Sequence, residues 1–169
     1  GARYRISEEA FMSSFGWLNN LTIRSSYGTS GNQEVGDSDV EEGWYAAQGL
    51  YGFGYNYNSQ PGMVQVQLAN RNLQWELTKK FNLGFDIGVF NRVNVEFDYY
   101  RHLTDDMVFG VPLSLTTGMS ESYQNIGQLE NKGVEFTVNA LIINNQKLKW
   151  DVSFVGSHNK NTIKKLSTD

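Results

Sequence analysis

Carboxylates are the side chains of this sequence that could carry out acid–base catalysis or bind calcium. Asp105 and Asp106 are adjacent, and Glu96 and Asp98 precede them by a few residues. If they lie on a strand, Asp105 and Asp106 point to opposite faces of the sheet. No glycine-containing calcium loop follows them. We interpret these four residues as a solvated acidic rim, without a metal site and without a catalytic pair.

The other usual parts of an active site are scarce. The sequence has no cysteine and two histidines, His102 and His158, and neither histidine has a partner in the sequence pattern. Residues 49–54 (GLYGFG) resemble a phosphate-binding loop only in their glycines, because no helix start follows them. We therefore expect no enzyme activity, no metal and no cofactor. The net charge of −4 also argues against a nucleic-acid partner.

Aromatic residues interleaved with glycine and asparagine indicate a binding surface. They lie within residues 29–72, which we expect to be a long loop containing an acidic piece at 34–42 and a short strand at 64–68. Loops of this length are usually functional or disordered. Aromatic faces among amide groups suit sugars or peptides, although the same rings could simply pack on one another within the loop. The candidate substrate-binding residues are Trp44, Tyr45, Tyr51, Tyr55 and Tyr57.

Residues 79–103 organise the rest of the chain. Apolar and polar residues alternate from Phe81 to Val89 and again from Val93 to Tyr99, on either side of a turn at residues 91–92. A period of two predicts a hairpin with one apolar and one polar face. Each run has about ten residues, close to the roughly 9–11 that a tilted strand needs to cross a bilayer.

A second hairpin of the same design is expected at residues 133–154, with its turn at 144–146. The connections then alternate in length, long at 29–72 and 104–132 and short at the two turns. Outer-membrane barrels show this asymmetry, with lipid on the apolar face and the lumen on the polar face. Near the strand ends, Phe90, Tyr99, Tyr100 and Trp150 suit an aromatic girdle. The predicted lumen-facing residues are Asn82, Asp86, Asn94, Glu96, Asp98, Glu135 and Asn139.

The fold class that we predict is all-β. We expect an antiparallel meander of long hairpins that forms part of a transmembrane β-barrel, a strand at 17–27, and a short helix of about two turns that starts with the pattern at residues 7–12 and ends before Gly16. An alternative fits the same alternation: a soluble β-sandwich in which the apolar residues form the core and the aromatic loop binds glycan.

Several stretches resemble the barrel of SusC/RagA-type TonB-dependent outer-membrane transporters of Bacteroidetes. Their order and spacing agree across nearly the whole chain. The matching stretches are YRISEE at 4–9 with Phe11-Met12, WLNNL at 17–21, RSSYG at 24–28, GNQ at 31–33, NLQWE at 72–76, FNLGFD at 81–86, DYY at 98–100, VPL at 111–113 to Thr117-Gly118, NIG at 125–127, ENKGVE at 130–135 and NKN at 159–161.

The resemblance implies a large barrel with an N-terminal plug, located in the cell outer membrane. It also implies a SusD-type surface lipoprotein as partner and import of oligosaccharides or peptides driven by the TonB complex. We expect residues 1–169 to be a single internal segment of such a barrel, in contact with outer-membrane lipid and lacking the signal, the plug and the closing strands. The alternative function is that of a soluble β-sandwich glycan-binding module.

Overall fold

The computed structural model describes residues 1–33 and 45–166. The chain divides into two compact units, which we describe separately. The first comprises residues 1–29, 79–103 and 130–162, and the second comprises 30–78, 104–129 and the residues from 163. Among the described residues, no helix is long and apolar enough to cross a membrane.

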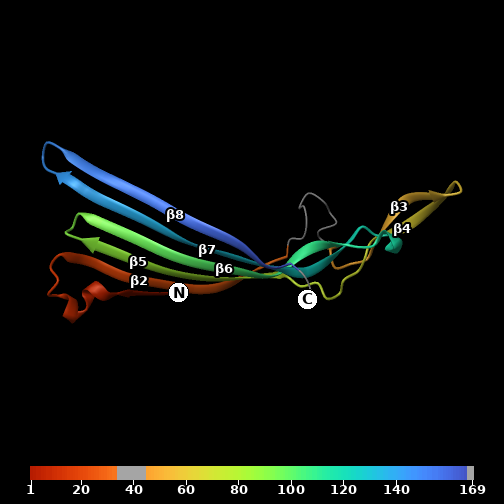
Figure 1. Cartoon of the computed structure of the whole chain (residues 1–169), viewed down its shortest axis with the longest axis horizontal. Helices are drawn as coiled ribbons and strands as arrows, with labels where there is room; N and C mark the ends of the chain where they lie inside the picture. Colours follow the sequence, from red (N-terminus) through yellow and green to blue (C-terminus); the bar gives the residue numbers. More distant parts are fainter. Residues whose placement is uncertain (34–44, 167–169) are drawn as a thin grey trace. The chain divides into compact units, whose positions relative to one another are not determined.

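Six strands form one sheet in the order β1-β2-β5-β6-β7-β8, and Figure 1 shows β2, β5, β6, β7 and β8 side by side in this order. Apart from the separate β3-β4 pair, each strand neighbours the next one along the chain, so the predicted meander is confirmed. Strand β1 pairs antiparallel with β2, placing Arg3 opposite Arg24. The strands are β1 (Ala2–Arg5), β2 (Leu18–Asn32), β5 (Glu76–Val89), β6 (Val93–Pro112), β7 (Glu121–Asn144) and β8 (Lys149–Leu166).

The segment between β1 and β2 is helical, but it is not one regular helix. Two 3-10 turns, η1 (Ile6–Glu8) and η2 (Ala10–Met12), stand where a single helix of about two turns was predicted. Glu9 separates them in an extended conformation, with φ of −74° and ψ of 145°. The acidic residues that favour a helix start therefore produce only isolated turns.

The strands β6 and β7 are much longer than the alternating pattern predicts. The long connection expected at 104–132 is wrong, because β6 continues to Pro112 and β7 starts at Glu121. Only residues 113–120 connect the two strands, and they include the 3-10 turn η4 (Leu115–Thr117), which ends at Gly118 in the left-handed conformation.

The region predicted as a loop at 29–72 contains a hairpin of its own. Strands β3 (Leu50–Tyr57) and β4 (Gln60–Gln67) pair antiparallel, with Tyr57 opposite Gln60. Asn58 and Ser59 make the two-residue turn with φ of 48° and 61°, the left-handed pair that matches the twist of a hairpin. The acidic piece at 34–42 lies outside the described residues.

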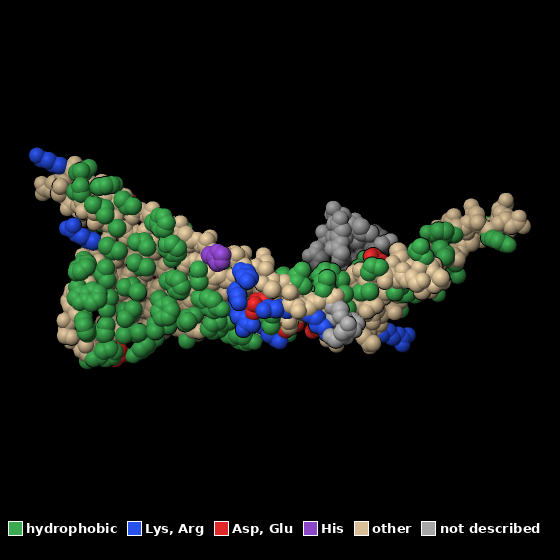
Figure 2. Space-filling model, in the orientation of Figure 1, with side chains coloured by type: hydrophobic (Ala, Val, Ile, Leu, Met, Phe, Trp, Pro, Cys, Tyr) green, Lys and Arg blue, Asp and Glu red, His purple; other side chains and the backbone are tan. Residues whose placement is uncertain are grey.

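The sheet has no conventional hydrophobic core. Among the described residues, Ala46 is the one buried hydrophobic residue, whereas Phe81, Phe97 and Phe154 of the main sheet are exposed. Figure 2 shows hydrophobic side chains spread over a broad surface. A sandwich would bury these residues between two sheets, so the β-sandwich alternative is not supported.

Aromatic residues gather at the short-turn end of the first unit. The rings of Phe15 and Trp17 meet edge to face with centroids 6.3 Å apart, and Trp17 also packs against Phe90 at 6.2 Å. Phe90 and Asn91 form the turn between β5 and β6, both with positive φ. Phe90 was predicted as a girdle residue, and the structure places Trp17, from the segment before β2, against its ring, with Phe15 packed on Trp17 in turn.

Candidate functional site

An ion-pair network crosses three strands on the polar face of the first unit. Arg24 on β2 donates from Nε to both carboxylate oxygens of Asp86 on β5, at 3.0 and 3.1 Å. Its Nη2 lies 2.9 Å from Asp86 Oδ1 and 3.0 Å from Asp98 Oδ2 on β6. One guanidinium thus joins three neighbouring strands.

The backbone positions this network through register and a glycine. Arg3 lies opposite Arg24 on β1, and its Nη2 is 3.8 Å from Asp86 Oδ2. Gly84 lies between the charged groups: a Cβ atom there would be 2.8 Å from Arg24 Nη2 and 2.9 Å from its Cζ. The lack of a side chain at position 84 therefore lets the guanidinium lie flat across the sheet.

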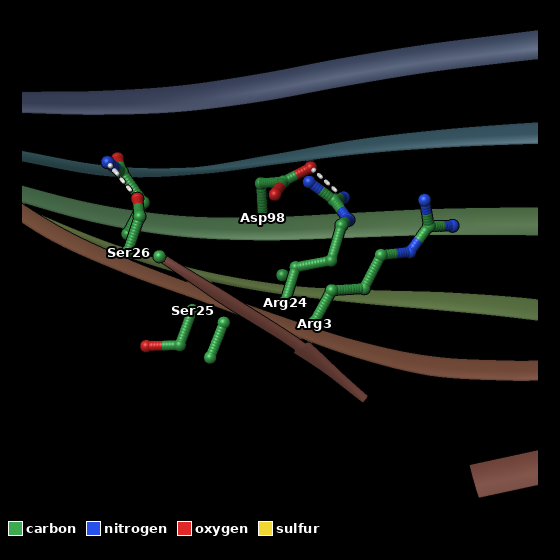
Figure 3. Close-up of a pocket in the computed structure, with 9 residues that line it drawn as sticks. Arg3, Arg24, Ser25, Ser26 and Asp98 are labelled. Carbon is green, nitrogen blue, oxygen red and sulfur yellow. Dashed lines mark hydrogen bonds and ion pairs between the residues drawn. The ribbon is translucent and has the colours of Figure 1, made fainter. Parts of the chain in front are cut away.

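A shallow hollow of about 330 Å³ adjoins the network. Figure 3 shows Arg24 reaching toward Asp98 with Arg3 beside it, while Ser25 points to the opposite side of β2. Asn82 donates to the Ser26 hydroxyl at 3.2 Å along the same wall. The hollow is lined by Gly1, Ala2, Arg3, Arg24, Ser25, Ser26, Asn82, Gly84 and Asp98.

The chemistry of this wall is that of hydration and polar contact. Two arginines and two aspartates balance each other, so the network presents fixed hydrogen-bonding groups with little net charge. Within residues 1–33 and 45–166, no group of three His, Cys, Asp or Glu side chains could hold a metal ion. Such a surface suits the passage or weak binding of a polar solute.

The predicted lumen-facing residues are distributed over this face. The network brings Asp86 and Asp98 together through Arg24, and Asn82 bonds separately to Ser26 on the same wall. Arg24 and Ser26, both on β2, were not on the predicted list. Asn94 lies near Gly88, with its Oδ1 3.1 Å from where a Cβ of Gly88 would be. Glu96, Glu135 and Asn139 are exposed on their strands.

The predicted aromatic surface is divided between the two faces of the β3-β4 hairpin. A bulge at Gly54, where φ is +90°, shifts the register between Phe53 and Tyr55. Tyr51 and Phe53 therefore share one face, whereas Tyr55 lies near Gly52 on the other. Tyr57, at the tip, is 86% exposed. Tyr45 precedes the hairpin and is exposed, and Trp44 lies outside the described residues.

The acidic rim and the histidines have structural contacts. Asp105 accepts a hydrogen bond from Gln128 Nε2 at 2.5 Å, and the Asp106 carbonyl accepts one from Asn125 Nδ2 at 2.6 Å. Asp106 has a φ of 58°, so the strand is irregular there. The ring of His102 packs against Tyr100 at 5.3 Å, and His158 is exposed on β8.

Long strands, an exposed apolar face and a charged polar face define the wall of an outer-membrane β-barrel. Comparison with known proteins agrees: residues 1–165 match the family described as TonB dependent receptor-like, beta-barrel. The chain belongs to this family, whose members are outer-membrane proteins, and it resembles the SusC/RagA type.

Relatives and solved structures give the same result. The chain is 40% identical to TonB-dependent receptor P39 of Formosa agariphila, with 98% of this chain and 15% of that protein covered. It is 34% identical to TonB-dependent receptor SusC of Bacteroides thetaiotaomicron, and the match covers 97% of this chain and 17% of SusC. The structure of the RagAB peptide importer in its closed-closed state matches with a TM-score of 0.80 and 31% identity, and the match covers 98% of this chain and 18% of that chain. The chain spans about a sixth of the length of these relatives.

Proposed function

We propose that this chain forms part of the barrel of a TonB-dependent transporter that imports oligosaccharides or peptides across the outer membrane. A SusD-type surface lipoprotein and the TonB complex would be its partners. The likeness to SusC and to the RagAB peptide importer supports this class of activity. Because RagAB is described as a peptide importer, peptides are one candidate substrate class. Oligosaccharides are the other.

The observation that carries the proposal is the opposite chemistry of the two faces of one sheet. Arg24, Asp86 and Asp98 interlock on one face. On the other face Phe154 is 61% exposed and packs against Phe136 at 5.6 Å. An apolar face of this kind is favourable against lipid acyl chains but costly in water. The polar face would then line the lumen, including the exposed Glu96, Glu135 and Asn139.

Adjacent positions on β7 test which face meets water. In the full-length receptor, Asn139→Cys is expected to react rapidly with a membrane-impermeant maleimide because its side chain points into the lumen. Val138→Cys, one residue earlier and on the other face, is expected to stay protected by lipid. Labelling would be measured by the mass increase of the receptor in isolated outer membranes.

The same pair provides a control for thiol reactivity and a test of transport. Both variants should react equally after solubilisation in denaturant, which shows that both thiols are intact. Reaction of the Asn139→Cys receptor with a bulky maleimide should also slow substrate uptake. Equal protection of the two cysteines in membranes, or preferential labelling at position 138, would overturn the proposed orientation.

The tip of the β3-β4 hairpin is the place where we expect an aromatic contact with substrate. Tyr57→Ala in the full-length receptor should weaken binding by about tenfold, the value of one aromatic stacking contact of roughly 1.4 kcal/mol. Binding of an oligosaccharide mixture and of a peptide mixture would be measured separately. The control is Tyr27→Ala, an exposed tyrosine on β2. If both variants bind both mixtures like the unaltered receptor, the hairpin tip has no substrate role.

A further inference from the structure

A buried carboxylate holds two cations on the apolar side of the sheet. Glu130 accepts from Arg101 Nε at 2.7 Å and lies 2.6 Å from Arg101 Nη2. Its other oxygen is 3.6 Å from Lys132 Nζ. The Glu130 side chain is 3% exposed, whereas those of Arg101 and Lys132 are 52% and 43% exposed. The carboxylate thus fixes two cations that remain open to the surroundings.

These cations lie on the same face of the sheet as the apolar side chains. Arg101 follows Phe97 by four residues on β6, and Lys132 precedes Phe136 by four residues on β7, so alternation places all four side chains on one face. A Cβ atom at Gly156 of β8 would meet the Phe136 ring. Lys160, four residues beyond Gly156 on an antiparallel neighbour, therefore lies level with Lys132. Figure 2 shows basic side chains at the edge of the hydrophobic area.

The cluster lies at one edge of the membrane-spanning band. The Arg92 carbonyl accepts from the Leu141 amide at the short-turn end, and Arg101 is nine residues further along β6. At about 3.3 Å per residue this is roughly 30 Å of strand. A tilt of about 40° reduces it to about 23 Å, close to the roughly 25 Å of a barrel's apolar band. The cations are therefore at the edge opposite the short turns, which is the outer leaflet.

We propose that Arg101, Lys132 and Lys160 bind the phosphate of an outer-leaflet glycolipid headgroup. Three cations against one carboxylate leave two net positive charges. Glu130 engages Nε and Nη2 of Arg101, so Nη1 would donate to a phosphate oxygen without giving up that contact. The neighbouring aromatic rings, Phe97, Phe136 and Phe154, would contact the acyl chains. This adjoining apolar face favours a lipid over free phosphate as the occupant.

Lipid binding can be measured on the full-length receptor in detergent by native mass spectrometry with added bis-phosphorylated lipid A. The test variant, Lys132→Gln with Lys160→Gln, keeps the Arg101–Glu130 pair. Its affinity should fall by about thirtyfold, because each lysine near an anionic surface contributes about fivefold. The charge-matched control is Lys147→Gln with Lys149→Gln at the short-turn end, and it should bind like the unaltered receptor.

Two further probes distinguish the sources of the phosphate. Dephosphorylated lipid A should bind as weakly to the unaltered receptor as to the test variant, and inorganic phosphate should not displace lipid A at equal concentration. Equal loss in the test and control variants would overturn the proposal, as would undiminished binding of the dephosphorylated lipid or displacement by inorganic phosphate. If the double variant fails to fold, Lys160→Glu alone is used, since Lys160 is exposed on β8. Substrate import is not measured, so this proposal is separable from the transport proposal.

Discussion

Gly133→Val is expected to abolish most folded receptor in the outer membrane. A Cβ atom at this position on β7 would lie 2.5 Å from the backbone oxygen of His158 on β8 and 2.7 Å from Tyr100 Cζ on β6. The carbonyl belongs to the backbone of a neighbouring strand, so it cannot rotate away. Overpacking of this kind costs about 1–3 kcal/mol or more. The measurement is the fraction of receptor that migrates as the heat-modifiable folded form on gels of outer membranes.

Two companion variants separate the steric cause from a general intolerance of valine. Gly28→Val on β2 meets no atom within 4 Å, and valine is favourable in strands, so its folded fraction should be unchanged. Combining Gly133→Val with Tyr100→Ala removes the ring but not the carbonyl and should restore folding only in part. Full folding of Gly133→Val alone would contradict the close approach of the three strands.

Arg24→Ala is expected to lower the free energy of unfolding by about 2 kcal/mol, in the range for removing a charged partner from hydrogen-bonded groups. Asp86 and Asp98 both bind this guanidinium, and their side chains are 17% and 37% exposed. Without it, two neighbouring carboxylates repel each other across β5 and β6. Denaturant unfolding of the full-length receptor in detergent would measure the change.

A second pair of variants identifies repulsion as the cause of this loss. Arg24→Ala with Asp86→Asn removes one of the two charges and should recover about half of the lost stability. Arg24→Lys keeps the charge but cannot bind two carboxylates through a planar fork, so it should lie between alanine and the native residue. An Arg24→Ala receptor as stable as the unaltered one would show that the network carries no stabilisation.

Strand direction and pairing were predictable because alternation is required where one face meets lipid. The error at 104–132 arises where this alternation stops. Asp106 has a φ of 58°, and beside it Asp105 on β6 and Gln128 on β7 form a polar pair in place of apolar residues. The strands continue while their pattern disappears. Pattern alone therefore recovered only the regularly alternating portion of β6 and β7.

The β3-β4 hairpin was missed for a different reason. The bulge at Gly54 shifts the alternation by one residue, so simple alternation assigns Tyr51 and Tyr55 to one face although they lie on opposite faces. The turn at Asn58-Ser59 was the available signal, since asparagine tolerates the left-handed conformation. The sequence showed that the segment is rich in aromatic residues, but it did not show the bulge that places them on two faces of the hairpin.

The polar wall was predicted in outline, without its central residue. Asp86 and Asp98 stand at polar positions of the central hairpin, so alternation alone assigns them to one face. Arg24 joins them across 62 and 74 residues of sequence, and nothing in its own strand indicates which carboxylates it meets. Alternation identifies faces, whereas contacts between strands require the register.

The position of the β3-β4 hairpin has a consequence for the order of assembly. Three residues join β5 to β6, but 43 residues separate β2 from β5, its neighbour in the sheet. Closing the longer loop costs about 2 kcal/mol more chain entropy. The hairpins β5-β6 and β7-β8 should therefore form early and β2 should join late. Formation of β3-β4 within the long loop shortens the stretch of chain that remains to be closed, which brings β2 nearer to its partner.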